Sequence, residues 1–207
     1  MAYEVFDRLT NEYEHWFNDN EILFQSEILA LQQVVPDDKK GVEIGIGSGI
    51  FAEKLGIKFG IDPSENMLNY ARARNLTVKK GFAENLPYTD QSFDFAAFIT
   101  SMCFIDNPEK ALTEAHRIIK SDGNIIIAML DKESTLGKTL ESEKENNPYF
   151  KYAGLFSVPE MTSLLSGHHF ETTDIWQTLF DMQSKIPENP IKGFGKGSFV
   201  VIKAKRK

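Results

Sequence analysis

Apolar and polar residues follow one another in blocks along this chain, and the blocks predict strands and helices in turn. Between residues 41 and 130, short apolar runs are each followed by a stretch with helical or turn-like character. The run from Phe93 to Thr100 is apolar on both faces, which is typical of a central parallel strand. Strands are expected at 41–46, 58–61, 76–81, 93–100 and 124–130, and helices at 50–55, 63–74 and 108–119.

The first 35 residues precede this alternation and have a helical pattern. Phe6, Leu9, Tyr13 and Phe17 recur at helical spacing, which predicts an amphipathic helix. A second helix is expected over residues 21–35 and ends before Pro36.

The last third of the chain changes character again. Residues 131–156 are polar and predict an excursion with one irregular helix. Ser157 and Glu160 are spaced as a capping box, so a helix is expected to begin there. The final strands, 171–180 and 198–203, are joined by a loop instead of a helix, which favours an antiparallel end to the sheet.

These patterns together predict an α/β protein. The fold class is a Rossmann-like, doubly wound, seven-stranded and mostly parallel sheet whose last strand is antiparallel, in a three-layer α/β/α sandwich. A chain of 207 residues is expected to form a single domain. Within it, residues 1–35 and 131–156 are expected to form a cap over the sheet.

Composition narrows the functional classes. The net charge is −7, and the basic cluster at the C-terminus is expected to be a solvated tail, so nucleic acid is not an expected partner. One cysteine, Cys103, cannot form an internal disulfide, which favours a reducing cytoplasm. No apolar run reaches the roughly 20 residues that span a membrane, and the N-terminus lacks a signal-peptide pattern.

A glycine-rich turn after the first strand carries the chemical information. Glycines at 45, 47 and 49 allow the backbone to turn tightly beside a ligand, and Glu43 precedes them in the strand. A dinucleotide-binding loop reads G-x-G-x-x-G, but the position of its third glycine is occupied by Ile50. The lysine and hydroxyl pair of a P-loop is also absent.

Asp62 stands at the carboxyl end of the second expected strand. A carboxylate there can accept hydrogen bonds from both hydroxyls of a ribose, and it can also cap the helix that begins near Pro63. Both roles remain open. Acidic residues beside the glycine turn favour a cofactor with positive character over one rich in phosphates.

Three further stretches complete a family pattern: Ala83–Asp94, Glu114–Asn124 and Glu12–Phe17. With the glycine turn and Asp62, the chain resembles class I S-adenosylmethionine-dependent methyltransferases, of the small-molecule type related to the ubiquinone/menaquinone-biosynthesis enzymes. The resemblance covers roughly residues 10–130 and is carried by topology beyond them. It departs from the family at Ser121–Gly123, where Pro-Gly-Gly is common, although Gly123 retains the expected turn.

The resemblance implies a site for S-adenosylmethionine. Gly45, Gly47 and Gly49 would pass beside its methionine portion, while Glu43 would help to hold the aminoacyl group and Tyr13 would close over the carboxylate. The remaining implied contacts are the ribose hydroxyls with Asp62, the faces of the adenine with Pro63 and Met67, the adenine edge with Ala83 and Glu84, and the sulfonium with Thr100.

The acceptor side is less determined. Methyl transfer requires alignment more than a catalytic base, and His15 is a weak candidate for substrate contact. No metal-binding spacing is present, and Cys103 is expected to line the pocket instead of acting as a nucleophile. The aromatic residues at 104, 149, 150, 152 and 156 either line an acceptor pocket or pack the cap on the core.

We therefore expect methyl transfer to an unidentified small molecule through an oxygen, nitrogen or carbon nucleophile. Two alternatives are a non-catalytic S-adenosylmethionine-binding regulatory module and an NAD(P)-dependent oxidoreductase, which Ile50 disfavours. A protein or nucleic-acid methyltransferase is disfavoured by the acidic balance and the small cap. A cytoplasmic monomer or weak homodimer completes the expectation.

Overall fold

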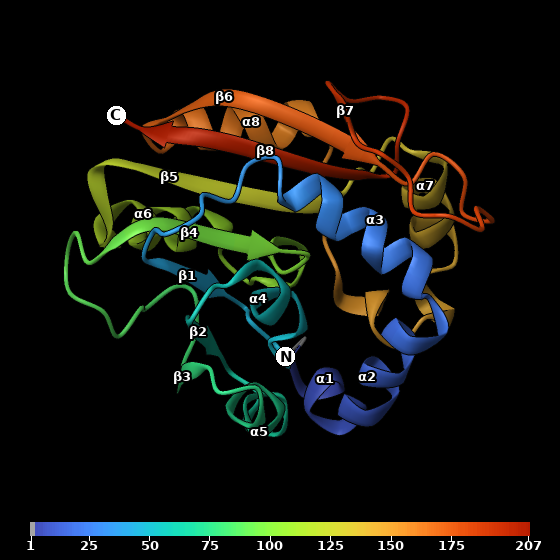
Figure 1. Ribbon diagram of the computed structural model, residues 1–207, viewed down its shortest axis with the longest axis horizontal. Helices are drawn as coiled ribbons and strands as arrows, with labels where there is room; N and C mark the ends of the chain where they lie inside the picture. The colour runs from blue at the N-terminus through green and yellow to red at the C-terminus, as the bar shows by residue number, and fades with distance from the viewer. Residues whose placement is uncertain (1–2) are drawn as a thin grey trace.

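The structure, a computed structural model, describes residues 3–207. Residues 1 and 2, which begin the predicted cap and the segment considered for a signal peptide, lie outside the described residues. A twisted sheet crosses the molecule and is flanked by helices on both faces (Figure 1).

The sheet has eight strands over residues 3–207, in the order β3-β2-β1-β4-β5-β8-β6-β7. The first five strands along the chain run parallel, and β8 is antiparallel to both of its neighbours, β5 and β6. The strands are β1 Gly41–Ile44, β2 Phe59–Asp62, β3 Thr77–Lys80, β4 Phe93–Ile99, β5 Ile119–Leu130, β6 Phe170–Thr178, β7 Ile191–Lys192 and β8 Phe199–Arg206. Strand order reverses between β1 and β4, and open α/β sheets bind ligands at this switch point.

Helices cover both faces of the sheet. Alternate residues of β5 face opposite layers: Ile125 and Ile127 pack with α6 and α8, whereas Ile126 and Ala128 pack with α3, α4 and α5. The α-helices are α1 Tyr3–Arg8, α2 Thr10–Asp19, α3 Glu21–Leu31, α4 Ile50–Leu55, α5 Glu65–Ala73, α6 Pro108–Ile118, α7 Thr135–Ser142 and α8 Val158–Gly167. Short 3-10 helices are η1 Met102–Phe104, η2 Lys144–Asn146 and η3 Phe150–Tyr152. The predicted three-layer, doubly wound class is confirmed.

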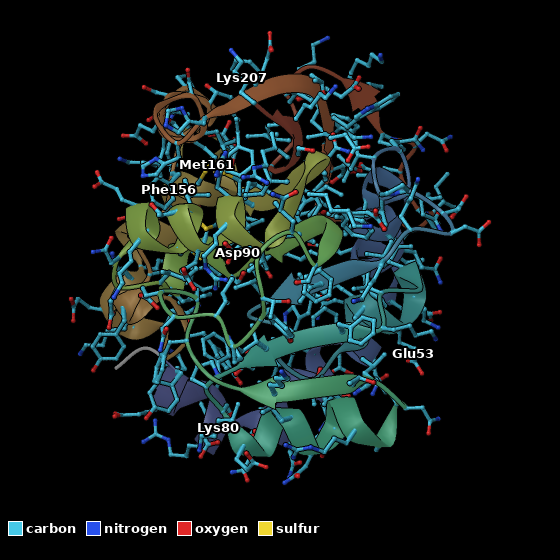
Figure 2. The ribbon with its side chains drawn as sticks, turned by 90° about the vertical axis from the view of Figure 1, so that its left-hand side faces the viewer. Glu53, Lys80, Asp90, Phe156, Met161 and Lys207 are labelled. Atoms are coloured by element: carbon cyan, nitrogen blue, oxygen red, sulfur yellow. The ribbon has the colours of Figure 1, made fainter. Side chains whose placement is uncertain are left out.

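The predicted number of strands was one too low. All seven expected strands are present, and Ile191–Lys192 adds a short edge strand, β7, within the loop expected between the last two strands. This loop turns back on β6 through the Gly193 N–H, which donates to the Ile175 carbonyl oxygen at 2.9 Å. Lys80 at the end of β3 and Lys207 beyond β8 lie toward opposite edges of the sheet (Figure 2).

Two local predictions also change. The expected turn at Ser121–Gly123 is a bulge inside β5, because Ile119 pairs with Phe93 and Asn124 already pairs with Phe95. The helix expected through Leu9 is broken there, and α1 and α2 are separate helices. The capping box at Ser157 is confirmed: its N–H donates to Glu160 Oε2 at 2.7 Å, and its Oγ accepts from the Glu160 N–H at 3.3 Å.

Gly41 lets β1 lie close beside β4. Gly41 and Phe95 are paired in register, and a Cβ at Gly41 would lie 2.1 Å from the Phe95 Cζ atom. We expect Gly41→Ala to lower the free energy of unfolding by about 2 kcal/mol, because the ring must move within a packed core. Urea unfolding measures this change. Gly167→Ala is the matched control, because a Cβ there meets no atom within 4 Å; an equal loss in both variants would contradict the explanation.

Candidate functional site

A cavity of about 510 Å³ lies where the strands β1, β2 and β4 end. These strands point toward the side of the molecule on which α1, α2 and α7 lie (Figure 1). The floor comes from the loops after the strands, and residues from α1, α2, α3 and the 131–156 segment cover it. Most of the predicted cofactor residues line this cavity: Tyr13, Gly45, Gly47, Asp62, Pro63, Met67, Ala83, Glu84 and Thr100.

Asp62 and the glycine loop are joined by backbone hydrogen bonds. The Gly47 N–H donates to Asp62 Oδ2 at 2.8 Å, and the Ser64 N–H donates to Oδ1 at 2.9 Å. Gly45 and Gly47 have φ values of 76° and 52°, in the left-handed region that glycine adopts without strain. Burial raises the pKa of Asp62 to about 6, against the two hydrogen bonds that lower it. The loop and the carboxylate therefore form one unit.

Glu43 lies beneath the glycine loop. Its side chain is buried, and its Oε2 atom has no hydrogen-bond partner within the described chain. Burial, and then the charge of Asp62, raises the pKa of Glu43 well above its usual value. Tyr13 in α2 approaches the loop from the other side, and burial followed by the charge of Glu43 raises its pKa too. A buried acceptor without a donor is costly unless a ligand supplies one.

The charge of the cavity has one sign. Four acidic residues line it, namely Glu27, Asp62, Glu84 and Asp106, whereas no Lys, Arg or His of residues 3–207 does so. Such a lining suits a ligand with cationic groups and opposes ligands rich in phosphates. The sulfonium and ammonium groups of S-adenosylmethionine fit this set of acidic side chains. The ammonium would also supply a hydrogen-bond donor to the unpartnered Glu43 oxygen.

The remaining predicted residues follow β2, β3 and β4. Pro63 comes directly after β2, and Met67 lies in α5 with its side chain buried. Ala83 and Glu84 lie in the loop after β3, where Glu84 Oε1 accepts from the Asn107 N–H at 3.1 Å. Thr100 directly follows β4 and has a φ of 50°, which is unusual for a β-branched residue and is typical of functional sites.

Three predicted residues, Glu43, Gly49 and His15, are not among those that line the cavity; Glu43 is buried beneath the glycine loop. Gly49 begins α4 with a φ of 79°, and a Cβ there would lie 2.4 Å from the Leu76 Cδ1 atom, so this glycine serves packing. His15 is exposed on α2, and its Nδ1 lies 2.8 Å from the Asn11 carbonyl oxygen. A direct contact of His15 with an acceptor in the cavity is not supported by this position.

Side-chain hydrogen bonds hold α1 and α2 to α5. Asp7 Oδ1 accepts from the Ser64 hydroxyl at 2.7 Å and from the Asn66 N–H at 3.1 Å. Tyr70 donates its hydroxyl proton to Asn11 Oδ1 at 2.6 Å. A further bond reaches the 131–156 segment, because the Tyr149 hydroxyl donates to the Leu9 carbonyl oxygen at 3.1 Å. The two parts of the predicted cap are therefore in contact.

The other end of the cavity is apolar. Phe104, Tyr149, Phe150 and Phe156 line it, whereas Tyr152 is 62% exposed and does not. Cys103 lines the cavity as predicted, and burial raises the pKa of its thiol to about 12, which keeps it protonated. Further apolar lining comes from Leu23, Leu130, Leu136, Leu140, Leu155, Leu179 and Met182.

Glu27 is the cavity residue that the sequence argument missed. It lies in α3 and is only 5% exposed, and burial raises its pKa to about 8. Asn20 and Leu23, seven and four residues earlier, line the cavity beside it. The available signal was the single carboxylate of the stretch Ile22–Leu31, whose other polar residues are the uncharged Gln25 and Ser26.

Two further features are absent from the described residues. No helix in residues 3–207 combines the length and apolarity needed to cross a membrane. The same part of the chain contains no group of three His, Cys, Asp or Glu residues arranged to hold a metal ion.

Comparison with known proteins agrees with this geometry. Residues 42–127 match the model of a methyltransferase domain. A crystal structure described as a S-adenosylmethionine-dependent methyltransferase, possible histamine N-methyltransferase, from Thermotoga maritima is 43% identical, covers 99% of this chain and 100% of that one, and superposes with a TM-score of 0.97.

Two sequence relatives extend the comparison. An uncharacterized protein of Methanocaldococcus jannaschii is 38% identical over 98% of both chains. A ubiquinone/menaquinone biosynthesis C-methyltransferase of Campylobacter jejuni is 35% identical over 100 residues, which is 46% of this chain and 42% of that enzyme. With its glycine loop, Asp62 and acidic cavity at the switch point of the sheet, the chain belongs to the class I S-adenosylmethionine-dependent methyltransferases.

Proposed function

We propose that this enzyme methylates a small molecule that binds in the apolar end of the cavity, beneath α1–α3 and the 131–156 segment. The observation that carries the proposal is the continuity of one partly covered cavity from the glycine loop and Asp62 to the aromatic residues of the cap. A macromolecular substrate would require an open surface beside the site. Here the cap covers it, and the net charge of −7 opposes nucleic acid.

The side chains have separate tasks in this proposal. Asp62 accepts hydrogen bonds from the ribose hydroxyls. Glu43 accepts a hydrogen bond from the ammonium of the aminoacyl group, and Tyr13 covers this group. Pro63 and Met67 flank the adenine. When bound, S-adenosylmethionine supplies an electrophilic methyl carbon, which forms a bond to the acceptor as its bond to sulfur breaks and the electron pair stays on sulfur. The cap aligns the acceptor with this carbon and excludes water.

The extent of the cavity supports an enzyme better than it supports a non-catalytic module that only binds the cofactor. A protein that only senses the cofactor needs no second compartment, whereas this cavity continues past Thr100 to Leu179 and Met182 after β6. The Thermotoga protein is described as a possible histamine N-methyltransferase. For this chain it supports a small-molecule acceptor.

Calorimetry with S-adenosylmethionine tests the first step. We expect saturable binding with a dissociation constant in the micromolar range, because several charged hydrogen bonds and the adenine faces contribute (on the order of 8 kcal/mol for 1 μM). Absence of binding at millimolar S-adenosylmethionine would refute the proposal. Release of S-adenosylhomocysteine from metabolite fractions then tests for an acceptor, and fractions of polymers, such as RNA or protein, serve as the negative control.

A further inference from the structure

Glu27 is a buried carboxyl group that the proposed cofactor contacts do not use. It lines the cavity from α3, and only 5% of its surface is exposed. Within residues 3–207 no side chain or backbone N–H donates a hydrogen bond to its carboxyl oxygens, and no Lys, Arg or His forms an ion pair with it. A buried carboxyl without a partner costs several kcal/mol when ionised.

The position of Glu27 separates it from the adenosine side of the cavity. Its helix, α3, packs against β6, β8, α4 and α2, whereas the residues proposed for the ribose and adenine follow β2 and β3. In the sheet, β8 and β6 lie on the opposite side of β1 from β2 and β3. Glu27 therefore lies away from the proposed ribose and adenine contacts, in the part of the cavity lined by Leu23 and Leu179.

The surroundings of Glu27 are apolar. Phe17, Leu23, Phe51 and Leu179 line the cavity and belong to one hydrophobic cluster with α3. An apolar pocket that contains one carboxyl group is complementary to a molecule with an apolar body and one cationic nitrogen. A carboxylate or phosphate on the acceptor would meet Glu27 and the other acidic residues without a compensating base.

Other ionisable groups near α3 are engaged elsewhere. On α2, Tyr13 is neutral at ordinary pH, because burial and nearby carboxylates raise its pKa. On α4, Glu53 forms an ion pair in which its Oε2 atom lies 3.4 Å from Arg74 Nε. In the loop after β6, Glu188 accepts from the Phe180 and Asp181 N–H groups. Of the other lining acids, Asp62 and Glu84 accept backbone N–H groups at the adenosine side, and Asp106 is exposed in the segment after η1.

We propose that Glu27 binds the cationic nitrogen of the acceptor, and that the acceptor of this enzyme is an amine with an apolar or aromatic body. This inference rests on the proposed function and narrows its substrate class. The ammonium supplies hydrogen-bond donors to a carboxylate that otherwise has none, and its charge stabilises the ionised form of Glu27. Glu27 is thus a specificity-determining residue for the acceptor.

Binding to the protein saturated with S-adenosylhomocysteine tests the proposal without a requirement for turnover. The probes are phenethylamine, histamine and butylamine, and 2-phenylethanol is the neutral counterpart of the first. Calorimetry at pH 8 is expected to show that at least one amine binds and that 2-phenylethanol binds about tenfold or more weakly than phenethylamine or not at all. Glu27→Gln should weaken amine binding about tenfold or more, whereas Glu21→Gln, an exposed control in the same helix, should not.

A pH series supplies a second readout. Burial raises the pKa of Glu27 in the empty cavity to about 8, so the bound ammonium displaces a proton at lower pH. Amine affinity of the wild-type protein should therefore rise up to about tenfold from pH 6.5 to 7.5, and Glu27→Gln should remove this dependence.

Each alternative result has a distinct meaning. If none of the three amines binds while S-adenosylhomocysteine does, or if Glu27→Gln binds amines as tightly as the wild type, the inference is overturned and the methyltransferase proposal stands. If Glu27→Gln weakens S-adenosylhomocysteine and leaves amine affinity unchanged, Glu27 belongs to the cofactor site and the inference is again overturned. Failure of S-adenosylhomocysteine itself to bind would instead remove the proposed function.

Discussion

Replacement of Asp62 with alanine is expected to weaken binding of S-adenosylhomocysteine about a hundredfold, which corresponds to about 2.7 kcal/mol. The proposed ribose hydroxyls would donate to a carboxylate that backbone N–H groups already hold in place. Hydrogen bonds to a charged group contribute about 1.5–3 kcal/mol each, and a preorganised acceptor loses little entropy on binding. Isothermal titration calorimetry at pH 7.5 measures the effect.

The same carboxylate predicts a pH dependence. Because the pKa of Asp62 is about 6, its ionised form dominates above this value and is lost as the pH falls through it. We expect cofactor affinity to be level above pH 7 and to decline below pH 6, and Asp62→Asn to flatten that decline.

Glu65→Ala is the matched control for Asp62. Glu65 begins α5 nearby, carries the same charge, has a side chain that is 47% exposed and does not line the cavity. Its removal should leave cofactor affinity within about twofold of the wild type. An unchanged affinity in Asp62→Ala, with a native circular dichroism spectrum, would remove Asp62 from the site.

Glu27 provides the second large effect, on stability. Its pKa is about 8 in the folded protein against 4.5 ordinarily. Between these values the folded chain retains a proton that the unfolded chain has released, so the free energy of unfolding must decrease as the pH rises through this interval. The full decrease is on the order of 4 kcal/mol for this group, and it is complete above pH 8.

Urea unfolding of the ligand-free protein at pH 5.5 and 8.5 measures this contribution. Glu27→Gln should lack it, so the variant should gain several kcal/mol relative to the wild type at pH 8.5 and less at pH 5.5. Glu21→Gln, exposed on the same helix, should follow the wild type at both values. If the free energy of unfolding of Glu27→Gln changed with pH as it does in the wild type, ionisation of Glu27 would not destabilise the folded protein, and the explanation would be wrong.

The sequence allowed the sheet to be predicted because its strands are short apolar runs bounded by turns. The spacing of Ser157 and Glu160 likewise predicted the start of α8. The break at Leu9 and the edge strand Ile191–Lys192 depend on contacts with distant parts of the chain, such as those of Asp7 with Ser64 and of β7 with β6. Spacing along the sequence carries no signal for such contacts.

The candidate site likewise contains residues that the sequence predicted and residues whose role depends on tertiary contacts. Gly45, Gly47 and Asp62 follow strands directly, so strand direction alone brings them together. Gly49 fits the same glycine pattern but faces Leu76 and Ala71, a packing contact that depends on how α5 and β3 are placed. Glu27 was missed because its helix was assigned from its apolar residues, and the acid among them was not given a separate meaning.

The attachment of α1 and α2 has a kinetic consequence. These helices contribute no strand to the sheet, and their polar ties to α5 are the side-chain hydrogen bonds of Asp7 and Asn11 and the ion pair of Glu14 with Arg74 at the end of α5. Local opening of such a segment requires far less free energy than global unfolding. We therefore expect ligands to enter and leave through local opening of this small helical unit. Amide exchange in α1 and α2 should then slow on ligand binding, while exchange in the central strands changes little.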